Sequence, residues 1–297
     1  MIELLTPNSM LDHQLLDSGD GLRLERFGNN IVSRPDAQCI WKKQSPSLWE
    51  KIDAICTKQS QGAYQWATKA SFKEPWTLSY TLPTGKKLNF LLRFSPYSKN
   101  IGIFPEQAPH WEWITNIIDQ HKEQLSLLNL FAYTGGATLS AAAAGAKVCH
   151  VDASQAAIKW AQQNHQLNQL PPDSVRWIVD DCATFVQREI KRHVTYDALI
   201  MDPPVFGRSG KTKIFAFETE IYKLLELCTK VLKKNPLFFI FNGYASGYSA
   251  TILKNLMHDF YPSHQIEWGE LHLTQSLDQT LPCSIYARLT QLSPKKP

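Results

Sequence analysis

The chain has 297 residues, of which 43% are hydrophobic and 20% are charged, as in an ordinary globular protein. This length allows one large or two ordinary domains, with a core that needs neither disulfides nor a structural metal. No run of about 18 apolar residues could span a bilayer, and residues 1–5 lack the basic region of a secretory signal. We therefore exclude membrane, secreted and fibrous proteins and expect a cytoplasmic location.

The charge is mildly basic, with 31 basic and 27 acidic residues and a formal net charge of +4. Such a balance permits a polyanionic partner without requiring one. The six cysteines occur singly, without a C-x-x-C pair, which indicates reduced thiols. The nine histidines show neither H-x-x-x-H nor H-E-x-x-H spacing, so we expect no metal site.

Residues 1–116 form a region rich in tryptophan and in turn signals, with six of the nine tryptophans of the chain. Short β-prone runs lie between the turns, at residues 22–27, 38–41, 76–82 and 87–94. We expect a smaller β-rich domain of about six strands, which could shape a substrate groove. Core packing is the more usual role of such tryptophans.

Residues 117–297 alternate short apolar runs with helical periodicity. Strands are predicted at 127–133, 147–152, 175–179, 196–201 and 237–241, and near 265–271 and 285–289. Helices are predicted at 137–144, after an N-cap at Ser154, at 184–191, along a stripe from 217 to 232 that ends at Asn235-Pro236, and at 250–257. This alternation predicts an α/β fold: a Rossmann-like sheet of seven mainly parallel strands with helices on both faces.

Small and acidic residues follow four of these strands. The first strand is followed by Gly135 and Gly136, the second by Asp152, the third by Asp181 and the fourth by Asp202. A glycine pair is usually only a turn, and such an aspartate is usually only a helix cap. Because ligands bind beyond the carboxyl ends of parallel strands, the four together indicate an adenosine pocket. The absence of G-x-G-x-x-G disfavours a dinucleotide-dependent oxidoreductase.

Four segments carry a resemblance to a known family: N-L-F-A-Y-T-G-G at 129–136, V-D-A-S at 151–154, D-C at 181–182 and M-D-P-P-V-F at 201–206. They resemble the motifs of class I S-adenosylmethionine-dependent methyltransferases. The branch that modifies large-subunit ribosomal RNA is the most similar, since its members share F-x-Y-T-G-G and D-P-P-x-F. Residues 102–107 also resemble the segment that precedes the first glycine motif in that branch.

The resemblance implies S-adenosylmethionine as the cofactor and assigns roles to named residues. The methionine part would lie along residues 133–136, the ribose on Asp152, and the adenine on the Asp181 side chain and the Cys182 amide. The complete set implied for the cofactor is Gln107, Phe131, Tyr133, Thr134, Gly135, Gly136, Asp152, Ala153, Asp181, Cys182 and Asp202. The implied catalytic set, which would face the acceptor base, is Asp202, Pro203 and Phe206.

The chain departs from relatives that make 5-methylcytosine, which use a cysteine after the fifth strand. The corresponding stretch, 241–247, contains no cysteine, and the loop thiol expected at Cys283 comes some forty residues too late. Methylation at a nitrogen needs no covalent step, and Asp202 with Asn242 could place the acceptor. Basic and aromatic residues nearby could contact phosphates and bases, or could belong to a solvated loop: Arg208, Lys211, Lys213, Tyr244 and Tyr248.

The leading hypothesis is a methyltransferase that acts on a base of large-subunit ribosomal RNA, without a cysteine nucleophile and without a metal. One alternative keeps the cofactor but takes a small molecule or a protein as acceptor. Another is a catalytically silent RNA-binding relative, which the intact glycine and aspartate positions disfavour. The sequence leaves the acceptor nucleotide, the acceptor atom and the oligomeric state open.

Overall fold

The structure is a computed structural model that describes residues 2–7, 12–60, 62–209, 213–244, 247–275 and 279–290. It divides into two compact units. The large unit contains Met1–Leu5, His110–Leu271 and Ser284–Pro297, and the small unit contains Thr6–Pro109 and His272–Cys283. No helix of the described part is long and apolar enough to cross a membrane.

The small unit is built mainly from strands. A five-stranded sheet has the order β2 (His13–Gly19), β3 (Leu22–Phe27), β4 (Asn30–Pro35), β5 (Ala54–Lys58) and β6 (Tyr64–Thr68). β7 (Trp76–Thr81) and β8 (Lys87–Leu92) form a separate antiparallel hairpin. Two short 3-10 helices complete the unit: η1 (Pro46–Lys51) lies between β4 and β5 in the chain, and η2 (Pro105–Gln107) follows β8. Alternate apolar side chains such as Leu24 and Leu78 are buried, as expected for sheets with one inward face.

Two details of this unit correct the sequence-based expectations. Residues 38–41 are not a strand, because Cys39 and Trp41 use their carbonyls to accept from the tight turn of Asp20 and Gly21 instead of joining a ladder. Cys283 is not in a loop but in the long strand β17 (Thr280–Thr290). Turn chemistry, which periodicity does not reveal, decides the first case.

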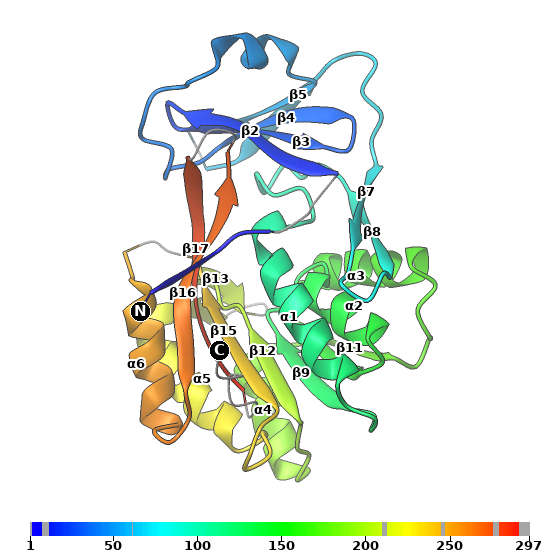
Figure 1. Ribbon diagram of the computed structural model, residues 1–297, viewed down its shortest axis with the longest axis vertical. Coiled ribbons are helices and arrows are strands. Elements are labelled where there is room, and N and C mark those ends of the chain that lie inside the picture. The colour runs from blue at the N-terminus through cyan, green and yellow to red at the C-terminus, as the bar shows by residue number, and fades with distance from the viewer. Residues whose placement is uncertain are drawn as a thin grey trace. The chain divides into compact units, whose positions relative to one another are not determined.

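The large unit contains an eight-stranded sheet (Figure 1). Its order is β1 (Glu3–Leu5), β16 (Ile266–Thr274), β17, β15 (Phe238–Gly243), β12 (Ala198–Met201), β9 (Ser126–Leu130), β10 (Lys147–Asp152) and β11 (Val175–Val179). The central strands pair in parallel, while β17 runs antiparallel to β15. The α/β fold with its seven expected strands is confirmed, and the short β1 adds an eighth.

Helices cover both faces of this sheet (Figure 1). One face carries α1 (Ala108–Asp119), α2 (Gly136–Ala143) and α3 (Gln155–Leu167). The other carries α4 (Cys182–Lys191), α5 (Phe217–Thr229) and α6 (Ala250–Phe260). Separate apolar clusters fill the two sides, one containing Ile114 and Leu127 and the other containing Phe185 and Phe239. The large unit therefore buries both faces of its sheet.

The helix boundaries follow local sequence signals only in part. Ser154 caps α3 as predicted, with its hydroxyl accepting from the Ala157 N–H at 3.2 Å. α5 ends at Thr229, before the end of its predicted apolar stripe. The stretch after the fourth strand, expected as a loop, contains a hairpin of β13 (Phe206–Ser209) and β14 (Lys213–Ala216). α1 was not predicted at all.

Candidate active site

The acidic and glycine positions of the large unit meet at one edge of its sheet. β12, β9, β10 and β11 are neighbours in that order and run in parallel, so their carboxyl ends lie together. The chain places Asp202 after β12, Asp152 at the end of β10 and Asp181 after β11. Between them, after β9, comes the segment 131–136, which we call the glycine loop. This edge is where open parallel sheets bind ligands.

The glycine loop has an unusual backbone that neighbouring elements hold in place. Phe131, Tyr133 and Gly135 have positive φ angles of 56°, 49° and 93°. Side-chain-bearing residues rarely adopt this region. The Tyr133 N–H donates to Oδ2 of Asp152 at 2.8 Å, and the side-chain amide of Asn164 donates to the Thr134 carbonyl at 3.0 Å. The loop is thereby tied to β10 and to α3.

Packing within the protein explains why the loop ends in two glycines. Gly135 is left-handed, and a Cβ added at Gly136 would lie 2.6 Å from Cζ2 of Trp111. α2 begins directly after this point, so its first backbone N–H groups lack partners within the helix. These N–H groups and the positive end of the helix dipole favour an anionic ligand group, such as a carboxylate.

Asp152 combines a structural and a binding capacity. Its two oxygens accept from the backbone N–H groups of Tyr133 and Ser154, both at 2.8 Å. Burial raises the pKa of Asp152 above that of an ordinary aspartate, although these two bonds offset part of the effect. Because each carboxylate oxygen offers two acceptor sites, the group can still accept from two hydroxyls of a ribose. Ala153 follows it before α3.

Asp181 also caps a helix. Its Oδ1 atom accepts from the backbone N–H and the hydroxyl of Thr184, at 2.9 and 2.7 Å. Cys182 is the first residue of α4, so its backbone N–H is one of those without an intrahelical acceptor. Burial holds the pKa of the Cys182 thiol well above its usual range, which marks it as an unreactive thiol.

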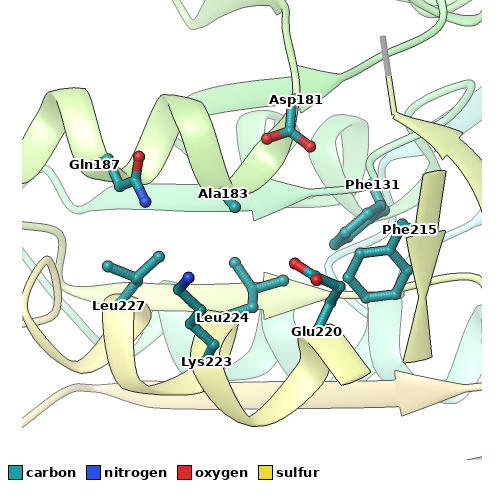
Figure 2. Close-up of a pocket in the computed structure, with 9 residues that line it drawn as sticks. All are labelled: Phe131, Asp181, Ala183, Gln187, Phe215, Glu220, Lys223, Leu224 and Leu227. Carbon is teal, nitrogen blue, oxygen red and sulfur yellow. The ribbon is translucent and has the colours of Figure 1, made fainter. Parts of the chain in front are cut away.

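A pocket of about 390 Å³, part of it open to solvent, lies between α4 and α5 beside Asp181 (Figure 2). The Asp181 carboxylate and the rings of Phe131 and Phe215 gather at one end, with ring centroids 5.2 Å apart. The full lining is Phe131, Asp181, Ala183, Gln187, Phe215, Glu220, Lys223, Leu224 and Leu227. An acceptor carboxylate beside aromatic rings fits a planar heterocycle that bears an amino group, such as adenine.

The acceptor side of the edge is formed by the segment that follows β12. The Asp202 N–H donates to the Leu130 carbonyl at 3.4 Å, and Pro203 stiffens the next bond of the chain. The Phe206 ring is 71% exposed. Asn242 lies near the end of the neighbouring strand β15, one residue after Phe241, which pairs with Met201 in β12. The Oδ1 atom of Asn242 lies 3.1 Å from Nε2 of His110.

Further predicted residues belong to other parts of the chain. Gln107 belongs to the small unit, at the end of η2. The Tyr248 hydroxyl donates to Glu218 at 3.0 Å, and its ring packs on Phe217, which ties it to α5. Lys211 lies outside the described residues, as do the side chains of Arg208 and Lys213. Within the described ranges, no three His, Cys, Asp or Glu side chains are placed to hold a metal ion.

The motifs did not predict the buried polar residues beneath the glycine loop. Asn129 and His150 lie in otherwise apolar strands, and Thr138 and Asn164 lie on the two adjoining helices. The available signal was the presence of polar residues within strands expected to be fully buried.

Comparison with known proteins places this chain in a family. A family model described as S-adenosylmethionine-dependent methyltransferase matches residues 75–243, more than half of the chain. A crystal structure of the SAM-dependent methyltransferase from Agrobacterium tumefaciens is 36% identical, with a TM-score of 0.90, and the match covers 98% of this chain and 94% of that one. The chain belongs to the S-adenosylmethionine-dependent methyltransferases, and S-adenosylmethionine is the cofactor of this family.

Two further proteins are similar to this chain. The ribosomal RNA large subunit methyltransferase K/L of Pseudoalteromonas translucida is 33% identical over 128 residues, which are 42% of this chain and 18% of that protein. The match spans less than a fifth of the length of this and similar curated relatives. A methyltransferase structure complexed with SAH (S-adenosylhomocysteine) has 18% identity and a TM-score of 0.71, with 95% of this chain and 76% of that chain covered, and shows the shared fold.

Proposed function

We propose that the protein transfers a methyl group from S-adenosylmethionine to a nitrogen of an RNA base, with large-subunit ribosomal RNA as the substrate. The observation that carries the proposal is the meeting of Asp152, Asp181, Asp202 and the glycine loop at the carboxyl edge of one parallel sheet. The relatives named as ribosomal RNA methyltransferases support the choice of substrate.

The cofactor's three parts match three groups of residues. Asp152 accepts from the ribose hydroxyls, while the Asp181 carboxylate and the Cys182 N–H hold the adenine beside Phe131. The glycine loop and the start of α2 hold the methionine part, whose carboxylate suits a helix N-terminus. When bound, S-adenosylmethionine supplies an electrophilic methyl group on a sulfonium, so orientation is the main contribution of the protein.

The acceptor residues favour a flat, polar substrate. The exposed ring of Phe206 offers a stacking surface for an unpaired base. Asp202 and Asn242, at the ends of two paired strands, supply an acceptor and a donor for the edge of that base. Asp202 can also hold the proton that the nitrogen loses after it receives the methyl group. Transfer to nitrogen requires no nucleophilic cysteine.

The cytoplasmic location and independence from metal stay predictions.

The test is a transfer assay with radiolabelled S-adenosylmethionine and total RNA from cells that lack the protein. We expect label in large-subunit RNA with the wild type and at least a hundredfold slower labelling with Asp202→Asn, which keeps the shape but loses the charge. Circular dichroism of this variant, compared with the wild type, controls for folding. RNA binding is expected to weaken steeply as salt rises.

Label in a protein or small-molecule fraction, and none in RNA, would overturn the proposed substrate but keep the methyl transfer. Binding of SAH without transfer to any fraction, including assembled ribosomal particles, would indicate a silent RNA-binding relative. Digestion of labelled RNA to nucleosides identifies the methylated atom, and a methyl group on a ring carbon would contradict transfer to nitrogen.

A further inference from the structure

Three buried polar side chains form a continuous chain of hydrogen bonds beneath the glycine loop. Nδ2 of Asn129 donates to the Thr138 hydroxyl at 2.9 Å, and that hydroxyl lies 2.9 Å from Nδ1 of His150. Asn129 and His150 are register partners in β9 and β10, and Thr138 comes from the first turn of α2. The exposed fractions are 3%, 0% and 0%. We call these three residues the relay.

Asn129 is the donor at one end of the relay. An amide nitrogen can only donate, so the Thr138 oxygen accepts from Asn129. The Thr138 hydroxyl and Nδ1 of His150 share the second hydrogen bond, whose proton lies on the oxygen or on the ring according to the histidine tautomer. Burial lowers the pKa of His150 to about 3, so the ring is neutral at pH 7 and Nδ1 is able to accept.

The relay ends directly under the loop. A Cβ added at Gly135 would lie 3.7 Å from Cε1 of His150, and the backbone of Tyr133 offsets part of the lowering of the His150 pKa. The Nε2 atom of His150 is buried. Asn164 supports the loop separately, through the Thr134 carbonyl.

Packing alone does not account for polar residues at this place. Buried apolar side chains of α2 and the sheet, such as Ala141 and Leu127, form a cluster at this interface, and buried polar groups cost free energy unless every partner is satisfied. The loop above contains two left-handed residues that are not glycine, a conformation that persists only when its surroundings hold it. A rigid hydrogen-bonded support supplies that constraint.

We propose that the relay of Asn129, Thr138 and His150 positions the glycine loop to bind the methionine part of the cofactor. This inference rests on the proposed function, because it takes the glycine loop as the site of that part. The three are positioning residues and do not contact the cofactor. Their loss is expected to weaken binding of ligands that carry the amino-acid part and to leave binding of the adenosine part unchanged.

The test compares two ligands on matched variants. Thr138→Val keeps the shape of the side chain and removes the hydroxyl, while Thr138→Ser restores the hydroxyl. SAH carries the amino-acid part, and 5′-methylthioadenosine lacks it. Ser174→Ala is the control. The Ser174 hydroxyl also forms a hydrogen bond with a buried histidine, His165, at 3.0 Å, but Ser174 precedes β11 and so lies at the amino ends of the strands, opposite the site.

We expect Thr138→Val to raise the Kd of SAH about tenfold, by calorimetry, and that of 5′-methylthioadenosine less than about twofold, with Thr138→Ser near the wild type. Ser174→Ala should leave both constants unchanged. Unchanged SAH affinity in Thr138→Val, or equal weakening of both ligands, would overturn the inference. If Thr138→Val does not fold, Thr138→Ala is judged by the same criteria. A wild type that does not bind SAH would instead overturn the proposed function itself.

Discussion

At the scale of single residues, the carboxylates of the site also build the fold. Asp152 accepts hydrogen bonds from the backbone N–H groups of Tyr133 in the glycine loop and of Ser154 before α3. Asp181 caps α4 by accepting from the Thr184 N–H. A helix cap and a ligand acceptor are therefore not exclusive roles, since one carboxylate has enough acceptor sites for both. A stability effect from changing either residue would not by itself argue against a role in binding.

Phe206 gives a prediction at this scale. Because its ring is 71% exposed, replacement by leucine should cost little stability but should remove a stacking surface worth about 1–3 kcal/mol per base. We expect Phe206→Leu to raise the KM for RNA about tenfold or more, with the Kd of SAH unchanged, and Phe206→Trp to retain most of the activity. Steady-state kinetics with an RNA fragment measure this. A wild-type KM in Phe206→Leu would remove Phe206 from the acceptor site.

At the scale of elements, α2 and the glycine loop show where sequence patterns suffice. The position of α2 and the strand β11 follow from periodicity, and the N-cap of α3 follows from Ser154. The need for glycine at position 136 does not follow from any local pattern. It depends on Trp111 in α1, a helix that was not predicted from the sequence. Contacts between distant segments lie beyond any local pattern.

The same limit applies to the candidate site. The aspartates that follow successive strands predicted that these side chains lie together at one edge of the sheet, since the carboxyl ends of parallel strands meet there. The relay beneath the glycine loop was missed, because only the register of Asn129 against His150 brings those side chains together. The assigned binding roles themselves stay predictions until a ligand is measured.

The contact between Gly136 and Trp111 predicts coupled stability effects. Gly136→Ala should lower the free energy of unfolding by about 1–3 kcal/mol, because its Cβ would overlap the indole ring. In a Trp111→Leu background, the same change should cost at least about 1 kcal/mol less. Urea denaturation of the four proteins in this cycle measures the coupling. Additive effects of the two changes would show that the ring does not exclude a side chain at position 136.

At the scale of the whole molecule, buried neutral histidines predict a loss of stability in mild acid. Burial lowers the pKa of His110 and of His150 to about 3, against about 6.5 in an unfolded chain. The unfolded state therefore binds more protons between these values, so the stability that each group contributes is complete above pH 6.5 and declines as the pH falls. Each histidine should lower the free energy of unfolding by about 1.4 kcal/mol per pH unit below pH 6.5, which amounts to about 2 kcal/mol at pH 5.

Urea denaturation from pH 7 to pH 5 tests this, with His150→Asn as the comparison. The variant is less stable at pH 7, but its further loss by pH 5 should be about 2 kcal/mol smaller than that of the wild type. The difference between the two declines isolates one histidine from other titrating groups, including Glu106, whose raised pKa acts in the opposite direction. Equal declines would show that His150 is not buried in its neutral form.

Every role proposed above requires that the carboxyl edge of the sheet binds the cofactor. Calorimetric titration of SAH into the wild type and into Asp152→Asn tests it directly, with circular dichroism to establish that both are folded. We predict one site in the wild type and a Kd at least about tenfold higher in the variant, because hydrogen bonds to a charged carboxylate are worth about 1.5–3 kcal/mol. No binding by the wild type, or equal binding by both proteins, would contradict the account.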